Sequence, residues 1–152
     1  MANISRFFVT SDSEYASSAK AIQQNAGLSP SAELPVPEGH GVVYDKRRID
    51  VNNFEGARNQ KFAACTGTLI YDGETGAGAL SNLLDDFTGD VKEAQQQATG
   101  HYAVLIRTSD TIYIFGDRGQ SYDIYYSTRS DRWFVSSDFA TTTKVLDHIT
   151  LN

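Results

Sequence analysis

The sequence contains a single cysteine, Cys65, and no apolar run near the roughly 20 residues that a helix needs to span a bilayer. One cysteine excludes an internal disulfide framework. Residues 1–16 have neither a basic lead nor an apolar core of signal-peptide length, so we expect a cytoplasmic protein without a membrane partner. Basic residues are also few: 13 Lys and Arg stand against 19 Asp and Glu, for a formal net charge of -6. This balance argues against nucleic acid as the main partner, because phosphate binding requires clustered cations.

Metal-binding chemistry is not indicated either. The three histidines, His40, His101 and His148, are widely scattered, and we expect no metal and no cofactor. Cys65 follows Phe62, Ala63 and Ala64, and we interpret it as a small buried hydrophobe, with a nucleophile as the alternative.

The 152 residues include 40% hydrophobic and 21% charged positions, which predicts one globular domain over 1–152. Apolar and β-branched patterns predict strands at 5–10, 41–44, 48–51, 61–71, 101–108, 111–117, 124–127 and 133–137. Helical spacing and capping residues predict helices between Ser11 and Gly27, around 80–87, between Asp90 and Gly100, and over 139–146. Three prolines predict that 28–40 is a loop, and the last four strands read as a meander. The expected class is α+β, with helices packed on antiparallel sheet.

Three segments of the second half stand in a characteristic order and spacing. They are Gly100-His101-Tyr102-Ala103-Val104-Leu105-Ile106, then Asp117-Arg118-Gly119 with Ile124-Tyr125-Tyr126-Ser127, then Phe134-Val135-Ser136-Ser137 before a helix ending Lys144-Val145-Leu146. They resemble the G-D-F-A, D-x-x-G-x-x-P-L-Y-Y and F-A-S-E-x-K-A-L segments of the glutamine amidotransferase domains of the asparagine synthetase and β-lactam synthetase family. The resemblance covers about residues 60 to 147.

The first half is similar to the same family more loosely. Gly39-His40-Gly41-Val42-Val43 resembles the R-G-x-D-x-x-G passage of class II amidotransferases, and Thr66-Gly67-Thr68-Leu69-Ile70-Tyr71 resembles their N-G-E-I-Y-N strand. The resemblance implies an Ntn-hydrolase-like αββα sandwich, in which two stacked antiparallel sheets lie between helical layers.

The resemblance also implies a site whose residues are altered here. The family's nucleophile is an N-terminal cysteine exposed by removal of the initiator methionine, and Ala2 stands at that position. Gly67 matches the glycine of the family's oxyanion site, but Thr66 replaces its asparagine. His101 replaces the aspartate that contacts the substrate ammonium group. Arg47 or Arg48 remains available to bind a substrate carboxylate.

Three hypotheses follow. The first is a catalytically inactive amidotransferase-like domain that acts in binding, scaffolding or assembly. Its partner would be a synthetase-like chain, since the sequence to Asn152 has no Gly-rich phosphate loop, or a second copy of itself. The second is a glutamine-hydrolysing subunit in which Ala2 is an engineered replacement of the cysteine. The third is an unrelated α+β structural or virion protein. Strand alternation sends Tyr125 and Tyr126 to opposite faces, so we expect one to be exposed and suited to a protein interface.

Overall fold

The computed structural model describes residues 6–44, 54–58 and 60–146, and for 54–58 it describes the backbone alone. The helices are α1 (Ser13–Asn25), α2 (Gly76–Asp86), α3 (Val91–Gln97) and α4 (Phe139–Val145). The strands are β1 (Arg6–Thr10), β2 (Pro30–Glu33), β3 (His40–Tyr44), β4 (Phe54–Arg58), β5 (Lys61–Tyr71), β6 (Glu74–Thr75), β7 (Thr99–Arg107), β8 (Ile112–Gly116), β9 (Tyr125–Arg129) and β10 (Arg132–Ser136).

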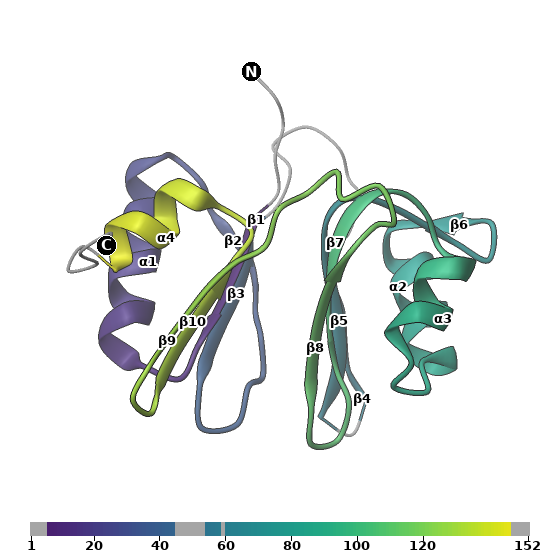
Figure 1. Ribbon diagram of the computed structural model, residues 1–152, viewed down its shortest axis with the longest axis horizontal. Helices are drawn as coiled ribbons and strands as arrows, with labels where there is room; N and C mark the ends of the chain where they lie inside the picture. Colours follow the sequence, from purple (N-terminus) through teal and green to yellow (C-terminus); the bar gives the residue numbers. More distant parts are fainter. Residues whose placement is uncertain (1–5, 45–53, 59, 147–152) are drawn as a thin grey trace.

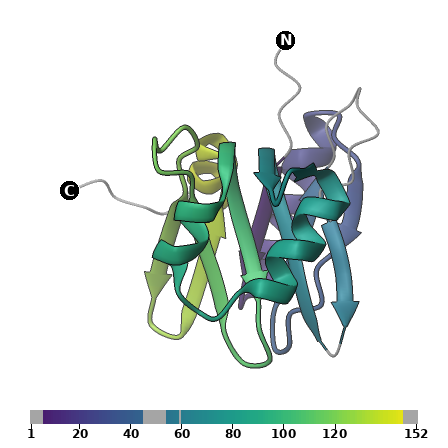
Figure 2. The ribbon, with the colours of Figure 1, turned by 90° about the vertical axis from the view of Figure 1, so that its right-hand side faces the viewer.

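The strands form two antiparallel sheets that face each other (Figure 1). The first sheet has the order β2-β3-β1-β10-β9, and the second has the order β4-β5-β7-β8 with β6 paired to β5. Helices α1 and α4 cover the outer face of the first sheet, while α2 and α3 lie across the outer face of the second (Figures 1 and 2). The α+β prediction is therefore confirmed at the level of two antiparallel sheets stacked between helices.

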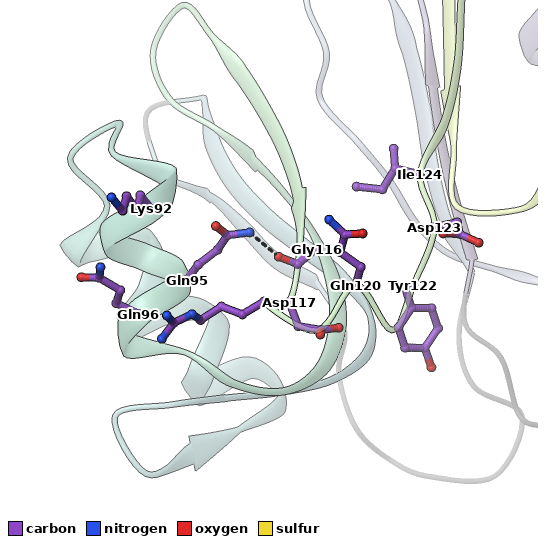
Figure 3. A pocket seen from close by; sticks show the side chains of 10 residues that line it. Lys92, Gln95, Gln96, Gly116, Asp117, Gln120, Tyr122, Asp123 and Ile124 are labelled. Carbon is purple, nitrogen blue, oxygen red and sulfur yellow. Dashed lines mark hydrogen bonds between the residues drawn. The ribbon is translucent and has the colours of Figure 1, made fainter.

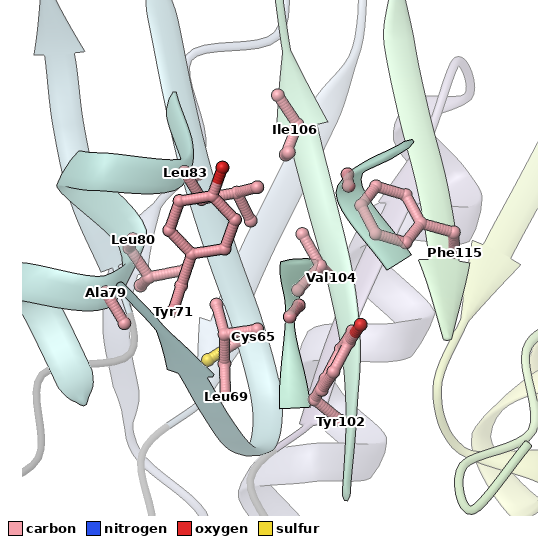
Figure 4. Close-up of a cluster of buried hydrophobic side chains, with 13 residues drawn as sticks. Cys65, Leu69, Tyr71, Ala79, Leu80, Leu83, Tyr102, Val104, Ile106 and Phe115 are labelled. Atoms are coloured by element: carbon pink, nitrogen blue, oxygen red, sulfur yellow. The ribbon is translucent and has the colours of Figure 1, made fainter. Parts of the chain in front are cut away.

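Three apolar layers hold these four layers of secondary structure together. Phe8 and Phe134 of the first sheet pack against Ala16 and Ala19 of α1. The layer between the sheets consists of Phe7, Val9, Leu34, Val43, Phe62, Ala64, Ala103 and Leu105. On the far side of the second sheet, residues of β5 and β7 pack against α2 and α3 (Figure 4). Strands β1, β5 and β7 are buried on both faces, which explains why they read as nearly continuous apolar runs.

Aspartate caps begin three of the four described helices. The side chain of Asp12 accepts from the Tyr15 N–H at 2.9 Å, and that of Asp90 accepts from the Glu93 N–H at 3.1 Å. Asp138 accepts from the Thr141 N–H at 2.9 Å. Each bond satisfies a backbone donor that the first helical turn leaves without an intrahelical partner. The helix starts predicted at Ser11–Ser13 and at Asp90 are confirmed.

The predicted loop over 28–40 was wrong in part, because β2 lies within it. Residues 30–33 pair with β3, and Pro30 is the first residue of an edge strand. Proline is tolerated there because its missing N–H would point away from the sheet. The strand predicted at 48–51 lies outside the described residues.

The predicted meander was also wrong. Strands β7 and β8 pair in the second sheet, whereas β9 and β10 pair in the first. Residues 117–124, here called the crossing segment, carry the chain from one sheet to the other (Figure 1). Ser109-Asp110 and Ser130-Asp131 lie at the turns of these two hairpins, but a turn signal identifies only the two strands it joins. The sheet that a hairpin enters depends on long-range packing.

Two tyrosines in the layer beneath α2 and α3 differ in how their hydroxyls are satisfied. The Tyr71 hydroxyl donates to Gln97 Oε1 at 2.6 Å, and Asp86 Oδ2, a second acceptor, lies 3.2 Å from the same hydroxyl oxygen. The Tyr102 hydroxyl is buried and has no hydrogen-bond partner among the described residues. Burial, with nearby carboxylates adding to it, raises the pKa of each to about 12, so both stay neutral at physiological pH.

This difference predicts opposite effects of removing the two hydroxyls. Tyr71→Phe should lower the free energy of unfolding by about 0.5–1.5 kcal/mol, because a hydrogen bond is lost. Tyr102→Phe should leave stability unchanged or raise it by up to about 1 kcal/mol, because an unsatisfied buried polar group is removed. Urea denaturation of both variants is the measurement. A Tyr102→Phe protein less stable than Tyr71→Phe would contradict the assignment.

Candidate functional site

One end of the sandwich gathers the start of β1, the end of β3, the start of β7 and the crossing segment (Figure 1). Arg6 at the start of β1 lies opposite Tyr44 at the end of β3. In the second sheet, Thr66, Gly67 and Thr68 of β5 lie opposite Ala103, Tyr102 and His101 of β7. This is the site end of the molecule, and it contains every predicted site residue that the structure describes.

The start of β1 is fixed there by a polar network. Arg6 Nη1 donates to Gln23 Oε1 at 3.2 Å and lies 3.5 Å from Asp138 Oδ2. Gln23, almost fully buried on α1, donates through its amide to the Thr141 hydroxyl, and Thr141 donates in turn to Asp138. Buried polar groups of this kind are stable only when they are bonded, so the network fixes the direction in which β1 enters the sheet.

Asp117 anchors the crossing segment. Its side chain is only 6% exposed, and its carboxylate accepts from the N–H of Gly119 at 2.8 Å and of Ser121 at 3.1 Å. It also accepts from the Tyr102 N–H on β7 at 3.2 Å and from the Ser121 hydroxyl at 3.2 Å. Burial alone would favour the neutral acid, but the N–H donors of Tyr102, Ser121 and Gly119 together hold the pKa of Asp117 below its ordinary value of 3.8. Asp117–Gly119 is thus part of a turn that local hydrogen bonds hold in place.

His101 is held by the same segment. Its Nδ1 lies 2.7 Å from Ser121 Oγ, and Ser121 donates its hydroxyl hydrogen to Asp117. Because that hydroxyl has only one hydrogen, the bond to His101 requires the histidine to donate from Nδ1. The Nε2 of a neutral His101 is then an acceptor. At the position where the resemblance implies a carboxylate, this chain has an exposed imidazole bonded to a serine.

Thr66 and Gly67 lie inside the protein. Thr66 is fully buried and, by strand alternation, shares the inter-sheet face of β5 with Phe62 and Ala64. Gly67 has φ of +84°, a conformation that favours glycine, and a Cβ built on it would fall on the carbonyl oxygen of His101. The same Cβ would lie 2.6 Å from Cε2 of Tyr122, so the Tyr122 ring packs directly over Gly67.

The structure therefore brings together Thr66, Gly67 and His101, whereas Ala2, Arg47 and Arg48 lie outside the described residues. Sequence analysis missed the roles of Ser121 and Tyr122. Aspartate commonly bonds backbone N–H groups a few residues further on, so Asp117 was a signal for an ordered segment up to Ser121. No local signal points to the packing of Tyr122 on Gly67, because these residues meet only through the tertiary fold.

A pocket with a volume of about 540 Å³ lies beside the site end (Figure 3). Helix α3 lines it with Lys92, Gln95 and Gln96, and the end of β8 and the crossing segment complete it. Gln95 Nε2 donates to the Gly116 carbonyl at 2.7 Å and so ties α3 to β8 (Figure 3). Thr66, Gly67 and His101 are not among the lining residues. The pocket and the predicted site are thus neighbours that share the crossing segment.

Over the described ranges, no three His, Cys, Asp or Glu side chains are grouped so that they could hold a metal ion. Cys65 is buried, as predicted. None of the described helices is long and apolar enough to cross a membrane. A comparison of the sequence with models of known protein families found no match, and neither did a comparison with curated proteins.

The packing around Gly67 predicts a large effect of adding one methyl group. In Gly67→Ala the new methyl group would lie on a residue with positive φ and would clash with His101 and Tyr122. Gly73, in the turn after β5, also has a positive φ of +73°, but the space around it is open. Gly73→Ala should lower the free energy of unfolding by about 1–2 kcal/mol, because of the backbone conformation alone. Gly67→Ala should lower the free energy of unfolding by roughly 1–3 kcal/mol more than Gly73→Ala does, because the methyl group also overpacks the site. Chemical denaturation compares the two, and equal losses would contradict the close packing of Tyr122 on Gly67.

The Asp117 anchor predicts a pH-dependent stability. Asp117→Asn should lower the free energy of unfolding at pH 7 by about 1.5–3 kcal/mol, because an amide cannot accept from all of these donors. The folded pKa lies below the unfolded one, so the unfolded state binds the proton first as pH falls. The advantage of the wild type should thus be complete well above pH 3.8 and shrink below it. Asp131→Asn, an exposed hairpin position, is the control and should change stability by less than about 0.5 kcal/mol. A constant difference across this pH range would refute the anchor.

Proposed function

We propose that this chain is a catalytically inactive domain of the Ntn-type glutamine amidotransferase kind, a cytoplasmic pseudoenzyme that acts in binding, scaffolding or assembly. The proposal has two parts: descent from the amidotransferase fold, and the absence of glutamine hydrolysis. Different observations support each part.

Descent is supported by the layer order and by the position of the site end. Two stacked antiparallel sheets lie between helical layers, which is the arrangement that the resemblance implies (Figure 1). Thr66-Gly67 and His101 belong to two separate segments of the resemblance, and they lie on adjacent strands of the second sheet, with His101 opposite Thr68. Strand β1 begins at the same end of the sandwich. Together these three features support the proposed descent.

The observation that carries the inactive assignment is the Tyr122 ring over Gly67. Stabilising an oxyanion requires hydrogen-bond donors about 2.7–3.1 Å from an oxygen that is free to enter the site. At Gly67 the adjoining space is filled by an aromatic side chain that packs against the inter-sheet layer. Thr66 beside it is buried and offers a short hydroxyl instead of an amide. These features favour a structural role for Thr66 and Gly67, the residues that the resemblance places at the oxyanion site.

His101 supports the same conclusion. A carboxylate binds a substrate ammonium group most strongly, because its negative charge strengthens the hydrogen bonds between them. The imidazole of His101 uses Nδ1 to contact Ser121 and has no negative charge to offer. The position has therefore changed from substrate recognition to a contact that holds the crossing segment.

Exposed aromatic residues support a role in protein binding. Tyr126 on edge strand β9 is 75% exposed, and Phe139 at the start of α4 is 60% exposed. The ring of Tyr125 packs 5.2 Å from that of Phe139, so Tyr125 and Tyr126 do face opposite sides of the strand. Aromatic residues are enriched at protein interfaces. The partner proposed is a synthetase-like chain or a second copy of this chain.

A glutaminase assay on the Ala2→Cys variant tests the proposal. The unaltered protein should release no ammonia from glutamine and should give no heat of glutamine binding in isothermal titration calorimetry. Ala2→Cys should remain inactive, because Tyr122 and His101 still occupy the places where substrate would bind. Mass spectrometry must show that Met1 has been removed, and an established glutaminase serves as the positive control. Ammonia release by Ala2→Cys would instead support an active enzyme whose cysteine had been replaced.

A further inference from the structure

Two cations at the pocket between α3 and the crossing segment form no ion pair with any described residue. These are Lys92 on α3 and Arg118 in the crossing segment. Both side chains line the same pocket, so a ligand that enters it can approach either charge. Their charge is available to a ligand.

The acidic residues of the pocket wall do not neutralise this pair by contact. The Asp117 carboxylate is already bonded to the N–H groups of Gly119, Ser121 and Tyr102. Asp123 accepts from the Tyr125 hydroxyl at 3.1 Å. Each carboxylate therefore already accepts a hydrogen bond from another group, and neither forms an ion pair with Lys92 or Arg118.

The rest of the wall adds hydrogen-bond donors. Gln95 is held in place through its bond to the Gly116 carbonyl, and the amides of Gln96 and Gln120 also line the pocket. Gln120 has φ of +54°, a left-handed conformation that is unfavourable for a residue other than glycine. Such strain persists only where the surrounding structure enforces it. Here the Asp117 bonds on either side of Gln120 enforce it.

We infer that this pocket binds a small polar molecule through a carboxylate or phosphate group held by Lys92 and Arg118. The guanidinium of arginine matches the geometry of both oxyanions, and lysine adds a second charge. A volume of about 540 Å³ suits a small ligand, and a wall of amides and charged groups does not suit an apolar one. The inference goes beyond the proposed function and does not depend on amidotransferase descent, which the glutaminase assay tests separately.

The test is a titration followed by ¹H–¹⁵N NMR at low ionic strength, with sodium phosphate and with sodium succinate as probes. Sodium chloride at equal ionic strength is the control for general charge effects. We expect saturable shifts of the amide signals of residues 118–124 and of the side-chain amides of Gln95 and Gln120. Saturation by phosphate alone, by succinate alone or by both supports the site and identifies the oxyanion that it prefers. Shifts that do not saturate, or that chloride reproduces, would overturn it.

Charge-neutralising variants supply the second arm. Lys92→Gln and Arg118→Gln should each weaken binding by at least about tenfold, the effect of losing one charge-assisted hydrogen bond. Lys144→Gln removes an exposed lysine of α4 in the opposite helical layer, and it should leave the affinity unchanged. Lys92 and Arg118 are exposed, so these variants should fold, and the dispersion of their spectra verifies this. Equal affinities in all three variants would refute the assignment of the site to Lys92 and Arg118.

Discussion

The hydrogen bonds to the buried carboxylate of Asp117 are the interaction on which the site end depends. A chain that crosses between two sheets leaves backbone N–H groups without ladder partners, and each one buried without a partner is destabilising. Asp117 accepts two of them from its own segment, at Gly119 and Ser121, and a third from Tyr102 on β7. These bonds fix the crossing segment to the second sheet. The positions of Ser121, Tyr122 and the pocket wall all follow from that attachment.

The crossing segment has different effects on its two sides. Toward the inter-sheet layer it places Tyr122 over Gly67 and Ser121 against His101. Toward α3 it leaves a pocket with Arg118 and Gln120 in its wall (Figure 3). Tyr122 fills the space beside Gly67, where the amidotransferase resemblance implies an oxyanion, while a neighbouring pocket that the resemblance does not mention is open. The proposed ligand pocket therefore lies on the α3 side of the crossing segment.

Much of the fold could be predicted from sequence because its signals are local. The capping of α1 and α3 by Asp12 and Asp90 and the apolar run of β5 are examples. What failed depends on pairings between distant residues. The pairing of Pro30 at the sheet edge and the entry of β9 into the first sheet are decided by partners far along the chain. At the site, Thr66, Gly67 and His101 could be named from the sequence. The contact of Tyr122 with Gly67, which favours a structural role for these residues, arises only in the folded chain.

That contact also bears on whether a nucleophile was lost naturally or replaced. A working catalytic site must keep a hydrated cleft and unsatisfied polar groups, and these reduce stability. An enzyme disabled by one substitution at position 2 would retain that open cleft, because the neighbouring residues would still be those selected for catalysis. A chain that has long been under no selection for catalysis can acquire side chains that fill the cleft. Tyr122 over Gly67 and the bond from His101 to Ser121 are contacts of this stabilising kind, and they favour the proposal of natural loss over that of an engineered replacement.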